Sequence, residues 1–240
     1  MLGLMTDLAT AAGPIGALND DLRRRMYLFI RAARRPVSRD EAAAEVGISR
    51  KLAAFHLDKL VGLGLLVAHY ARPPERSAVL AGRSSKLYEP SDIEIDVSVP
   101  QRRYDIVGRI LVEAVAAAGP EEAAPDAAVR VAADHGKRLG TDARVRQNLR
   151  PLGAERALST AASLLDDCGY EPYRCSATSV SLRNCPFHDL AETQPDLVCN
   201  VNRSFIQGLL RGLGNETLDA HLTPKPGECC VTLSAVKENR

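Results

Sequence analysis

The sequence predicts an α+β protein in which an N-terminal helical motif with two strands precedes a C-terminal domain of helices and strands. Three observations carry this prediction. Two capped helix patterns meet at a glycine turn within residues 38–66, and two strand-like patterns follow them. Wide apolar helical patterns occupy much of residues 102–167. All six cysteines lie after residue 167, among further strand and helix patterns.

Composition limits the class of protein. At 240 residues the chain is long enough for two small domains, and its 45% hydrophobic content supports a real core. The net charge is only +1, so basic residues can act on a phosphate backbone only where they cluster locally. We find no apolar stretch of bilayer length and no signal-peptide layout, so we expect no membrane partner. We therefore expect a cytoplasmic protein, whose thiols stay reduced.

The N-terminal part begins with a helix that is capped within residues 19–21 and is expected to run to about Ala33. Residues 38–66 then have the pattern of a helix-turn-helix. Ser38 caps a short helix, Gly47 makes the turn, and Ser49 caps a second helix that stops at residues 62–64. We expect the second helix to bury one apolar stripe, and we expect its other face to be polar or basic. A basic face of this kind suits the major groove of DNA. The stripe comprises Leu52, Phe55, Leu57, Leu60 and Leu63, and the other face Arg50, Lys51, His56 and Lys59.

The next segment predicts a two-stranded wing. Strand-like residues 67–70 and 86–89 enclose a tip rich in arginine and proline. Arg76, Arg83 and Lys86 are candidate contacts to phosphates or to the minor groove, with Arg83 favoured because it follows Gly82. The alternative to the helix-turn-helix is an ordinary helical hairpin with a solvated charged face. The alternative to a DNA-binding wing tip is a flexible charged loop.

Two stretches of this region resemble the winged helix-turn-helix of bacterial ArsR-like transcriptional regulators. They are SRKLAAFHLDKLVGLGLL at 49–66, which looks like a recognition helix and first wing strand, and GRSSKLYEP at 82–90, which looks like the second wing strand. The resemblance covers residues 19–90. It implies a double-stranded DNA operator as partner, and the expected contacts are Ser49, Arg50, Lys51, His56, Lys59, Arg76, Arg83 and Lys86.

The expected domains follow from these patterns. We expect an N-terminal arm at 1–18, a DNA-binding domain at 19–90, a linker and dimerisation helix at 91–120 and a sensor domain at 121–240. Residues 90–100 alternate like a strand or form a linker. A wide apolar face at 102–118 suits a helix that builds a homodimer, because two half-sites need two recognition helices at fixed spacing. It could equally pack within its own subunit. Further helices are expected at about 125–139, stopped by Gly140, and at 153–167.

The C-terminal cysteines are candidate ligands. Cys185 precedes Pro186 at an expected helix N-terminus, where the helix dipole would stabilise a thiolate. Cys199 lies early in a helix expected at 195–213, and Cys229 and Cys230 start a strand. Three thiolates with a fourth, non-cysteine ligand suit an iron–sulfur cluster. Cys185, His188, Cys199 and one of the last pair suit tetrahedral zinc. Alternatively, the cysteines are small buried hydrophobic residues.

A second resemblance concerns this region. NCPFHDLAETQPDLVCNVNRSFIQGLL at 184–210 and PGECCVTL at 226–233 are similar to the C-terminal part of Suf-operon repressors, which bind an iron–sulfur cluster. The resemblance implies Cys185 and Cys199 as ligands together with one of Cys229 and Cys230. The spacing from Gly227 favours Cys230, whereas the strand phase favours Cys229.

We therefore expect a DNA-binding transcriptional regulator, a repressor that senses iron–sulfur or redox status, and not an enzyme. The histidines and acidic residues form no spaced hydrolase-like set. The glycine-rich stretch at 208–214 follows no expected strand, so it is not a nucleotide-binding loop. A zinc-binding or thiol-redox regulator without a cluster is the alternative within regulation. A protein-interaction module, in which the wing binds a protein partner, is the alternative outside it.

Overall fold

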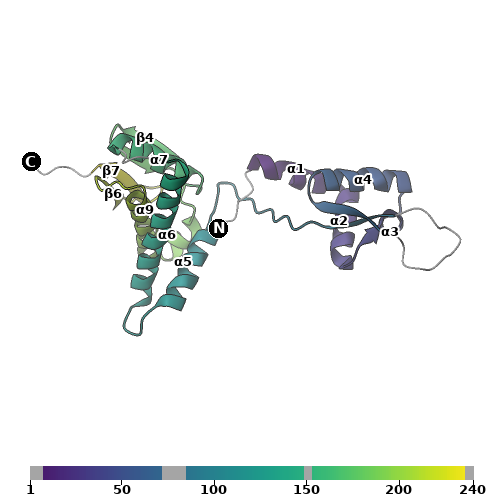
Figure 1. The fold of residues 1–240 in the computed structure, drawn as a ribbon, viewed down its shortest axis with the longest axis horizontal. Helices are drawn as coiled ribbons and strands as arrows, with labels where there is room; N and C mark the ends of the chain where they lie inside the picture. Colours follow the sequence, from purple (N-terminus) through teal and green to yellow (C-terminus); the bar gives the residue numbers. More distant parts are fainter. Residues whose placement is uncertain (1–7, 72–84, 149–152, 236–240) are drawn as a thin grey trace, which may run out of the picture. The chain divides into compact units, whose positions relative to one another are not determined.

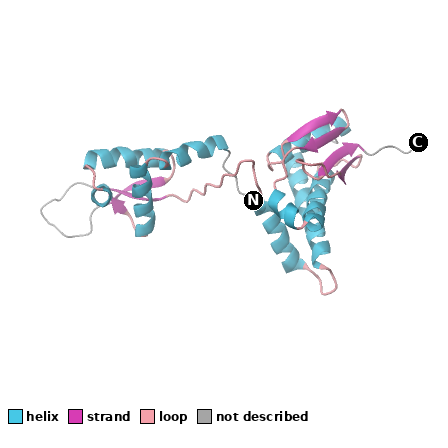
Figure 2. Ribbon diagram, turned by 180° about the vertical axis from the view of Figure 1, so that it is seen from behind, coloured by secondary structure: helices cyan, strands magenta, loops and turns pink. Residues whose placement is uncertain are grey.

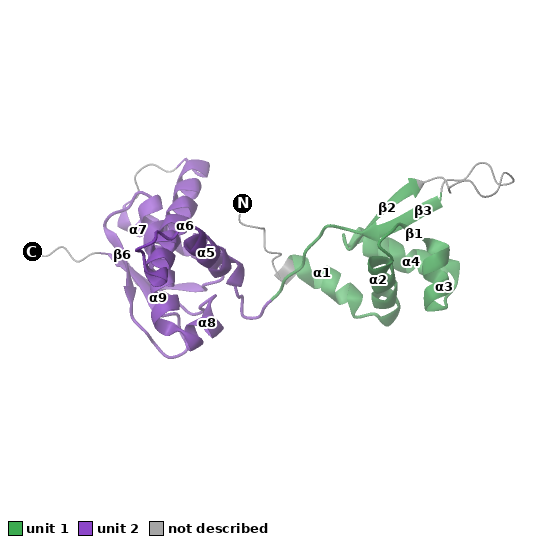
Figure 3. Cartoon of the chain, turned by 90° about the horizontal axis from the view of Figure 1, so that it is seen from below, with its two compact units in different colours: residues 1–97 green, residues 98–240 purple. Residues whose placement is uncertain are grey.

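Two antiparallel sheets, each accompanied by helices, give the chain a mixed α+β structure (Figures 1 and 2). The computed structural model describes residues 8–71, 85–148 and 153–235. The chain divides into unit 1, residues 1–97, and unit 2, residues 98–240 (Figure 3). No helix in the described part is both long enough and apolar enough to cross a membrane.

Unit 1 combines four helices with a three-stranded sheet of order β1-β3-β2. Its core includes Met26, Ile30, Leu57, Leu60 and Tyr88, and Tyr88 of the central strand lies between Val37 and Ala68 of its neighbours. The elements are α1 (Leu8–Leu18), α2 (Asp21–Ala33), β1 (Val37–Ser38), α3 (Arg39–Val46), α4 (Arg50–Gly62), β2 (Leu66–Ala71) and β3 (Ser85–Pro90).

The two ends of unit 1 are a helix, α1, and an extended segment that leads toward unit 2. Most of the expected N-terminal arm forms α1, which buries Ala11 and Ala17. Residues 91–103 form neither helix nor strand, so the alternation at 90–100 marks a linker rather than a strand. Ile95 of this segment is half-buried and packs against the core of unit 1.

Unit 2 contains five helices and a four-stranded sheet of order β4-β5-β7-β6. Helix α9 contacts α6 as well as strands β6 and β7, so it lies between α6 and the sheet. The elements are α5 (Tyr104–Ala117), α6 (Ala124–Arg146), α7 (Ala154–Asp166), β4 (Pro172–Ser176), β5 (Ser179–Leu182), α8 (His188–Thr193), α9 (Pro195–Gly212), β6 (Leu218–Leu222) and β7 (Val231–Ala235).

Helices α6 and α9 approach each other at four glycines. A Cβ atom on Gly136 would overlap the backbone of Phe205, and one on Gly208 would overlap the backbone of Ala133. Gly140 and Gly212 face the partner helix in the same way. The expectation that Gly140 ends the helix is therefore wrong. Gly140 lies inside α6, and a side chain there would not fit against α9.

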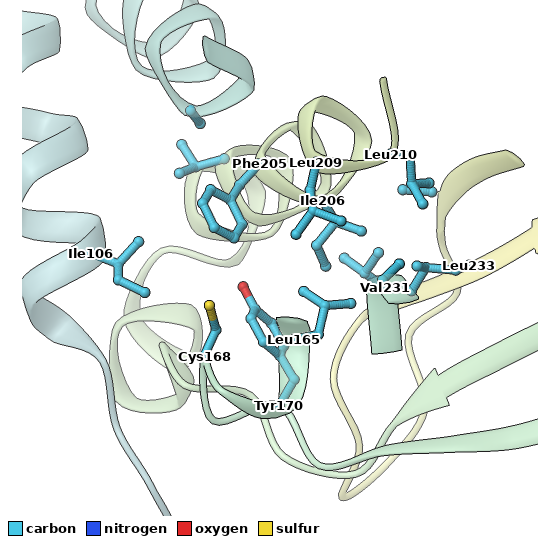
Figure 4. Packing of buried hydrophobic residues seen from close by; sticks show 14 of the residues in the cluster. Ile106, Leu165, Cys168, Tyr170, Phe205, Ile206, Leu209, Leu210, Val231 and Leu233 are labelled. Atoms are coloured by element: carbon cyan, nitrogen blue, oxygen red, sulfur yellow. The ribbon is translucent and has the colours of Figure 1, made fainter. Parts of the chain in front are cut away.

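The core of unit 2 lies around α9 and the inner face of the sheet. Phe205, Ile206 and Leu209 of α9 pack with Val231 and Leu233 of β7. Figure 4 shows Cys168 and Tyr170 pointing from the α7–β4 connection toward α9. This connection is therefore part of the core, although it is neither helix nor strand.

We predict that Gly208→Ala destabilises unit 2 by about 3 kcal/mol, because the methyl group would force the two backbones apart. Gly108→Ala is the matched control. Gly108 is an exposed helical glycine of α5 with nothing near its Cβ position, so the change should be stabilising by up to about 1 kcal/mol. Thermal and denaturant unfolding measure both. Equal stability of the two variants would contradict the glycine contact.

Candidate functional site

Capping interactions fix the geometry of helices α3 and α4. The Glu41 amide donates to Ser38 Oγ at 3.2 Å, and the Ser38 amide donates to Glu41 Oε2 at 2.8 Å. This bond from the Ser38 amide, assisted by Arg35, lowers the pKa of Glu41 to about 2. Gly47 turns the chain at φ 75°, and Ser49 Oγ accepts from the Leu52 amide. The angle between the helices is therefore set by short-range bonds.

Helix α4 buries Leu57 and Leu60 as expected, but the rest of its buried face differs from the expected stripe. Its buried residues are Ala53, His56, Leu57 and Leu60, which share one side of the helix at spacings of three and four. The proposed contact of His56 with DNA is therefore wrong, because this side chain is only 6% exposed. Its Nδ1 atom is buried and has no hydrogen-bond partner among the described residues. Leu52 and Phe55, expected in the core, are exposed instead.

The exposed face of α4 carries most of the expected basic contacts. Arg50, Lys51 and Lys59 are exposed, as is the capping residue Ser49. Arg50 pairs with Asp40 of α3 at 2.7 Å. Lys51 and Lys59 form no ion pair with any described residue, so their ammonium groups are available to an anionic partner.

Of the expected wing contacts, only Lys86 lies in the described chain. Lys86 Nζ lies 2.6 Å from Asp58 of α4 and 5.4 Å from the centre of the Tyr88 ring. The bond to Asp58 raises the pKa of Lys86 above its usual value. Lys86 thus ties β3 to α4. Arg76 and Arg83 lie within 72–84, outside the described residues.

The four candidate thiols of unit 2 come from three separate segments. Cys185 precedes α8, Cys199 lies on α9, and the vicinal pair precedes β7. The Cys229 amide donates to the carbonyl of Leu182 at 2.9 Å, which ties the pair to the end of β5 near Cys185. Cys185 and Cys229 are buried, whereas Cys199 and Cys230 are half-buried.

The pKa shifts report which thiols are neighbours. The Cys229 thiol raises the pKa of Cys185, and burial adds to this rise. The Cys185 thiol lowers the pKa of Cys229, but the Cys230 thiol and burial outweigh it and raise the pKa to about 12. Burial raises the pKa of Cys199, and the Cys230 thiol opposes it. The thiols therefore form a chain of neighbours in the order Cys185, Cys229, Cys230, Cys199, which we call the thiol chain.

The position of Cys185 overturns the expectation that a helix dipole makes it a thiolate. Helix α8 begins only at His188, whose amide donates to the Cys185 carbonyl at 3.1 Å. The Cys185 side chain instead lies against Cys229 in a buried environment, which favours the neutral thiol. A metal ion that binds the Cys185 sulfur would displace the thiol proton, and its positive charge would then stabilise the thiolate.

Two polar residues that we did not anticipate support the thiol chain. Asn202 Nδ2 donates to Cys229 Sγ at 3.2 Å, and the Tyr170 hydroxyl donates to Asn202 Oδ1 at 2.7 Å. Both side chains are completely buried. A signal was present in the sequence, because Asn202 interrupts the apolar face of α9 between Val198 and Phe205.

The donor chemistry of the thiol chain fits a soft metal or cluster, since thiolates are the ligands such groups prefer. The arrangement is not a ready-made coordination sphere. Within the described residues, no three Cys, His, Asp or Glu side chains are placed to hold a metal ion. His188, considered as a zinc ligand, is an exposed residue that pairs with Glu192 at 3.2 Å. Metal binding would therefore require the thiols to move closer together.

The residues beside Cys185 hold the beginning of unit 2. Asn184 Nδ2 donates to the carbonyls of Gln101 and Gly169 at 2.7 and 2.5 Å. Arg102 Nη1 donates to Asn184 Oδ1 at 2.6 Å, and the Arg103 amide donates to the Pro186 carbonyl at 3.0 Å. The Cys185 loop is thus bonded to residues 101–103, which lead into α5. We call these contacts the 101–103 clasp.

Comparison with known proteins adds no assignment. No protein-family model matches the chain, and no curated protein matches it.

We predict a graded reactivity of the cysteines in metal-free protein. Burial raises the pKa of Cys168 to about 11, so about one thiol in a thousand is ionised at pH 8, and the thiolate is the reactive form. Mass spectrometry after timed iodoacetamide treatment measures the order. Labelling of Cys168 or Cys229 as fast as Cys175 would contradict the described burial. The expected order is Cys175 first, then Cys199 and Cys230, and last Cys168, Cys185 and Cys229.

Proposed function

We propose that the protein is a transcriptional regulator, acting as a repressor, whose unit 1 is a winged helix-turn-helix that binds double-stranded DNA. The observation that carries the proposal is the capped α3–turn–α4 pair beside the antiparallel β2–β3 strands, with an exposed basic face on α4. In helix-turn-helix proteins the second helix enters the major groove and its N-terminal residues reach the bases. Ser49, Arg50 and Lys51 occupy that end of α4.

The charges of this face support phosphate binding. Lys51 and Lys59 lie eight residues apart on one side of α4, with no described carboxylate paired to either. The bond from Lys86 to Asp58 neutralises a carboxylate beside the face. Because the charge of Asp58 is neutralised, the potential at this face is more positive, which favours binding of an anionic partner.

A homodimer would present two α4 helices to two half-sites. Helix α5, which we expect to build the dimer, leaves Val112 70% exposed and Val115 78% exposed. Contact of these valine side chains with water is unfavourable, and packing against a second copy of the chain would remove it.

Charge reversal tests the DNA-binding proposal. We expect Lys51→Glu with Lys59→Glu to weaken binding of a duplex, selected from a random-sequence pool, by at least about tenfold. The dependence of log K on log salt should become shallower by about one unit for each lost phosphate contact. Fluorescence anisotropy over a salt series measures both.

The matched control is Arg156→Glu with Arg211→Glu, which changes the net charge equally at exposed positions of unit 2. It should bind nearly as well as the original protein. Salt-insensitive binding, or unchanged binding by the α4 variant, would refute the proposed surface and favour a protein-interaction module.

We infer further that the thiol chain holds an iron–sulfur cluster. Support comes from four thiols brought together from three segments, and from the Asn202 amide directed at Cys229 Sγ, as hydrogen bonds to sulfur tune such groups. A bound cluster would supply a redox-active group to unit 2. Both vicinal residues belong to the thiol chain, so Cys185, Cys199, Cys229 and Cys230 make up the proposed ligand set.

Anaerobic purification with an absorption spectrum and iron, sulfide and zinc analysis tests this inference. We expect iron and sulfide, both lost in Cys185→Ser and Cys199→Ser and retained in the exposed control Cys175→Ser. Stoichiometric zinc without sulfide would replace the cluster by the zinc alternative. Protein free of all three would leave the cysteines as buried or redox-active thiols.

A further inference from the structure

The exposed face of α4 contains a large aromatic ring that the packing of unit 1 does not use. Phe55 is 64% exposed, and Leu52, three residues earlier, is 40% exposed. Phe55 lies midway between Lys51 and Lys59, because residues four apart follow one ridge of a helix. Unit 1 therefore presents an apolar side chain between two cations.

Phe55 projects away from the core of unit 1. The four buried positions of α4 lie on the opposite side of the helix. Within the described chain, the aromatic ring beside Phe55 is that of His56, which it meets edge-on with the ring centres 5.4 Å apart. Among the described residues, the cations placed over aromatic rings are Lys86 on Tyr88 and Arg183 on Tyr173, so no cation covers Phe55. The ring is thus open to a partner.

The charges around the ring identify the chemistry of that partner. A partner that accepts both Lys51 and Lys59 must carry negative charge on either side of an apolar group. The major groove offers this combination, because phosphates border it and the 5-methyl group of thymine is its apolar feature. An apolar side chain in contact with that methyl group distinguishes thymine from the other bases.

We propose that Phe55, with Leu52 beside it, contacts the 5-methyl group of a thymine in the bound duplex and so helps to set sequence specificity. This inference rests on the proposed DNA-binding function. Lys51 and Lys59 hold the phosphates and orient α4, and the ring of Phe55 selects the base. The bound sequence accordingly contains thymine opposite α4 in each half-site.

Replacement of thymine by deoxyuridine tests the inference, because it removes only the methyl group. A duplex is first selected from a random-sequence pool with the full-length protein, and each thymine is then replaced singly. We expect one or two positions in each half-site to weaken binding by about fourfold, as for one buried methyl-sized group. At these positions Phe55→Ala should bind the thymine and uracil duplexes equally.

Leu28→Ala is the matched control, since Leu28 is an exposed apolar residue of α2, and it should keep the discrimination. If no replacement weakens binding, or if Phe55→Ala still discriminates, the inference is wrong while DNA binding stands. If the pool yields no bound duplex, the proposed function fails, and the inference fails with it. A changed oligomeric state in Phe55→Ala, with unchanged DNA affinity, would assign the ring to a protein interface and overturn the proposal.

Discussion

The backbone contact between α6 and α9 is the constraint on which unit 2 depends. At Gly136, Gly140, Gly208 and Gly212 neither helix has room for a side chain, so the separation of the helices is set by main-chain atoms. Helix α9 also carries Asn202 and, near its N-terminus, Cys199. Helix α9 contacts β6 and β7 on its other side, so it places these two residues beside the cysteines that precede β7 while its back is held against α6. A helix contact that contains no cysteine therefore supports the element that carries Asn202 and Cys199.

Short-range signals made most of the elements predictable from the sequence. Ser38 and Ser49 cap their helices as expected, because a cap depends only on residues within one turn. Gly140 shows the limit of such reasoning. A glycine that ends a helix and a glycine that admits another backbone look alike locally, and the reason for this one lies about 70 residues away in α9. Part of the buried face of α4 was misjudged because Leu52 and Phe55 were assumed to be internal. Ala53 and His56 are buried there instead, beside the expected Leu57 and Leu60.

The candidate site was predictable in composition but not in detail. The concentration of cysteine after residue 167 marked the region, and the structure groups four of the six thiols. The surroundings of Cys185 could not be predicted, because its neighbour Cys229 lies 44 positions later in the sequence. Asn202 and Tyr170 had no motif around them. Their roles follow from burial, since a buried amide and a buried phenol need hydrogen-bond partners. The Tyr170 hydroxyl bonds Asn202, and the Asn202 amide bonds Cys229 Sγ.

The 101–103 clasp gives the thiol chain a physical connection to the segment that leads from unit 1. Asn184 and Pro186 flank Cys185 and together bond Gln101, Arg102 and the Arg103 amide. Gathering of the thiols around a metal would move Cys185, and its two neighbours could not follow without disturbing bonds of 2.6–3.0 Å. Coupling between two sites requires an element whose arrangement both sites bias. In the proposed regulator the clasp is the candidate for such an element, because it joins the Cys185 loop to residues 101–103, which lead into α5.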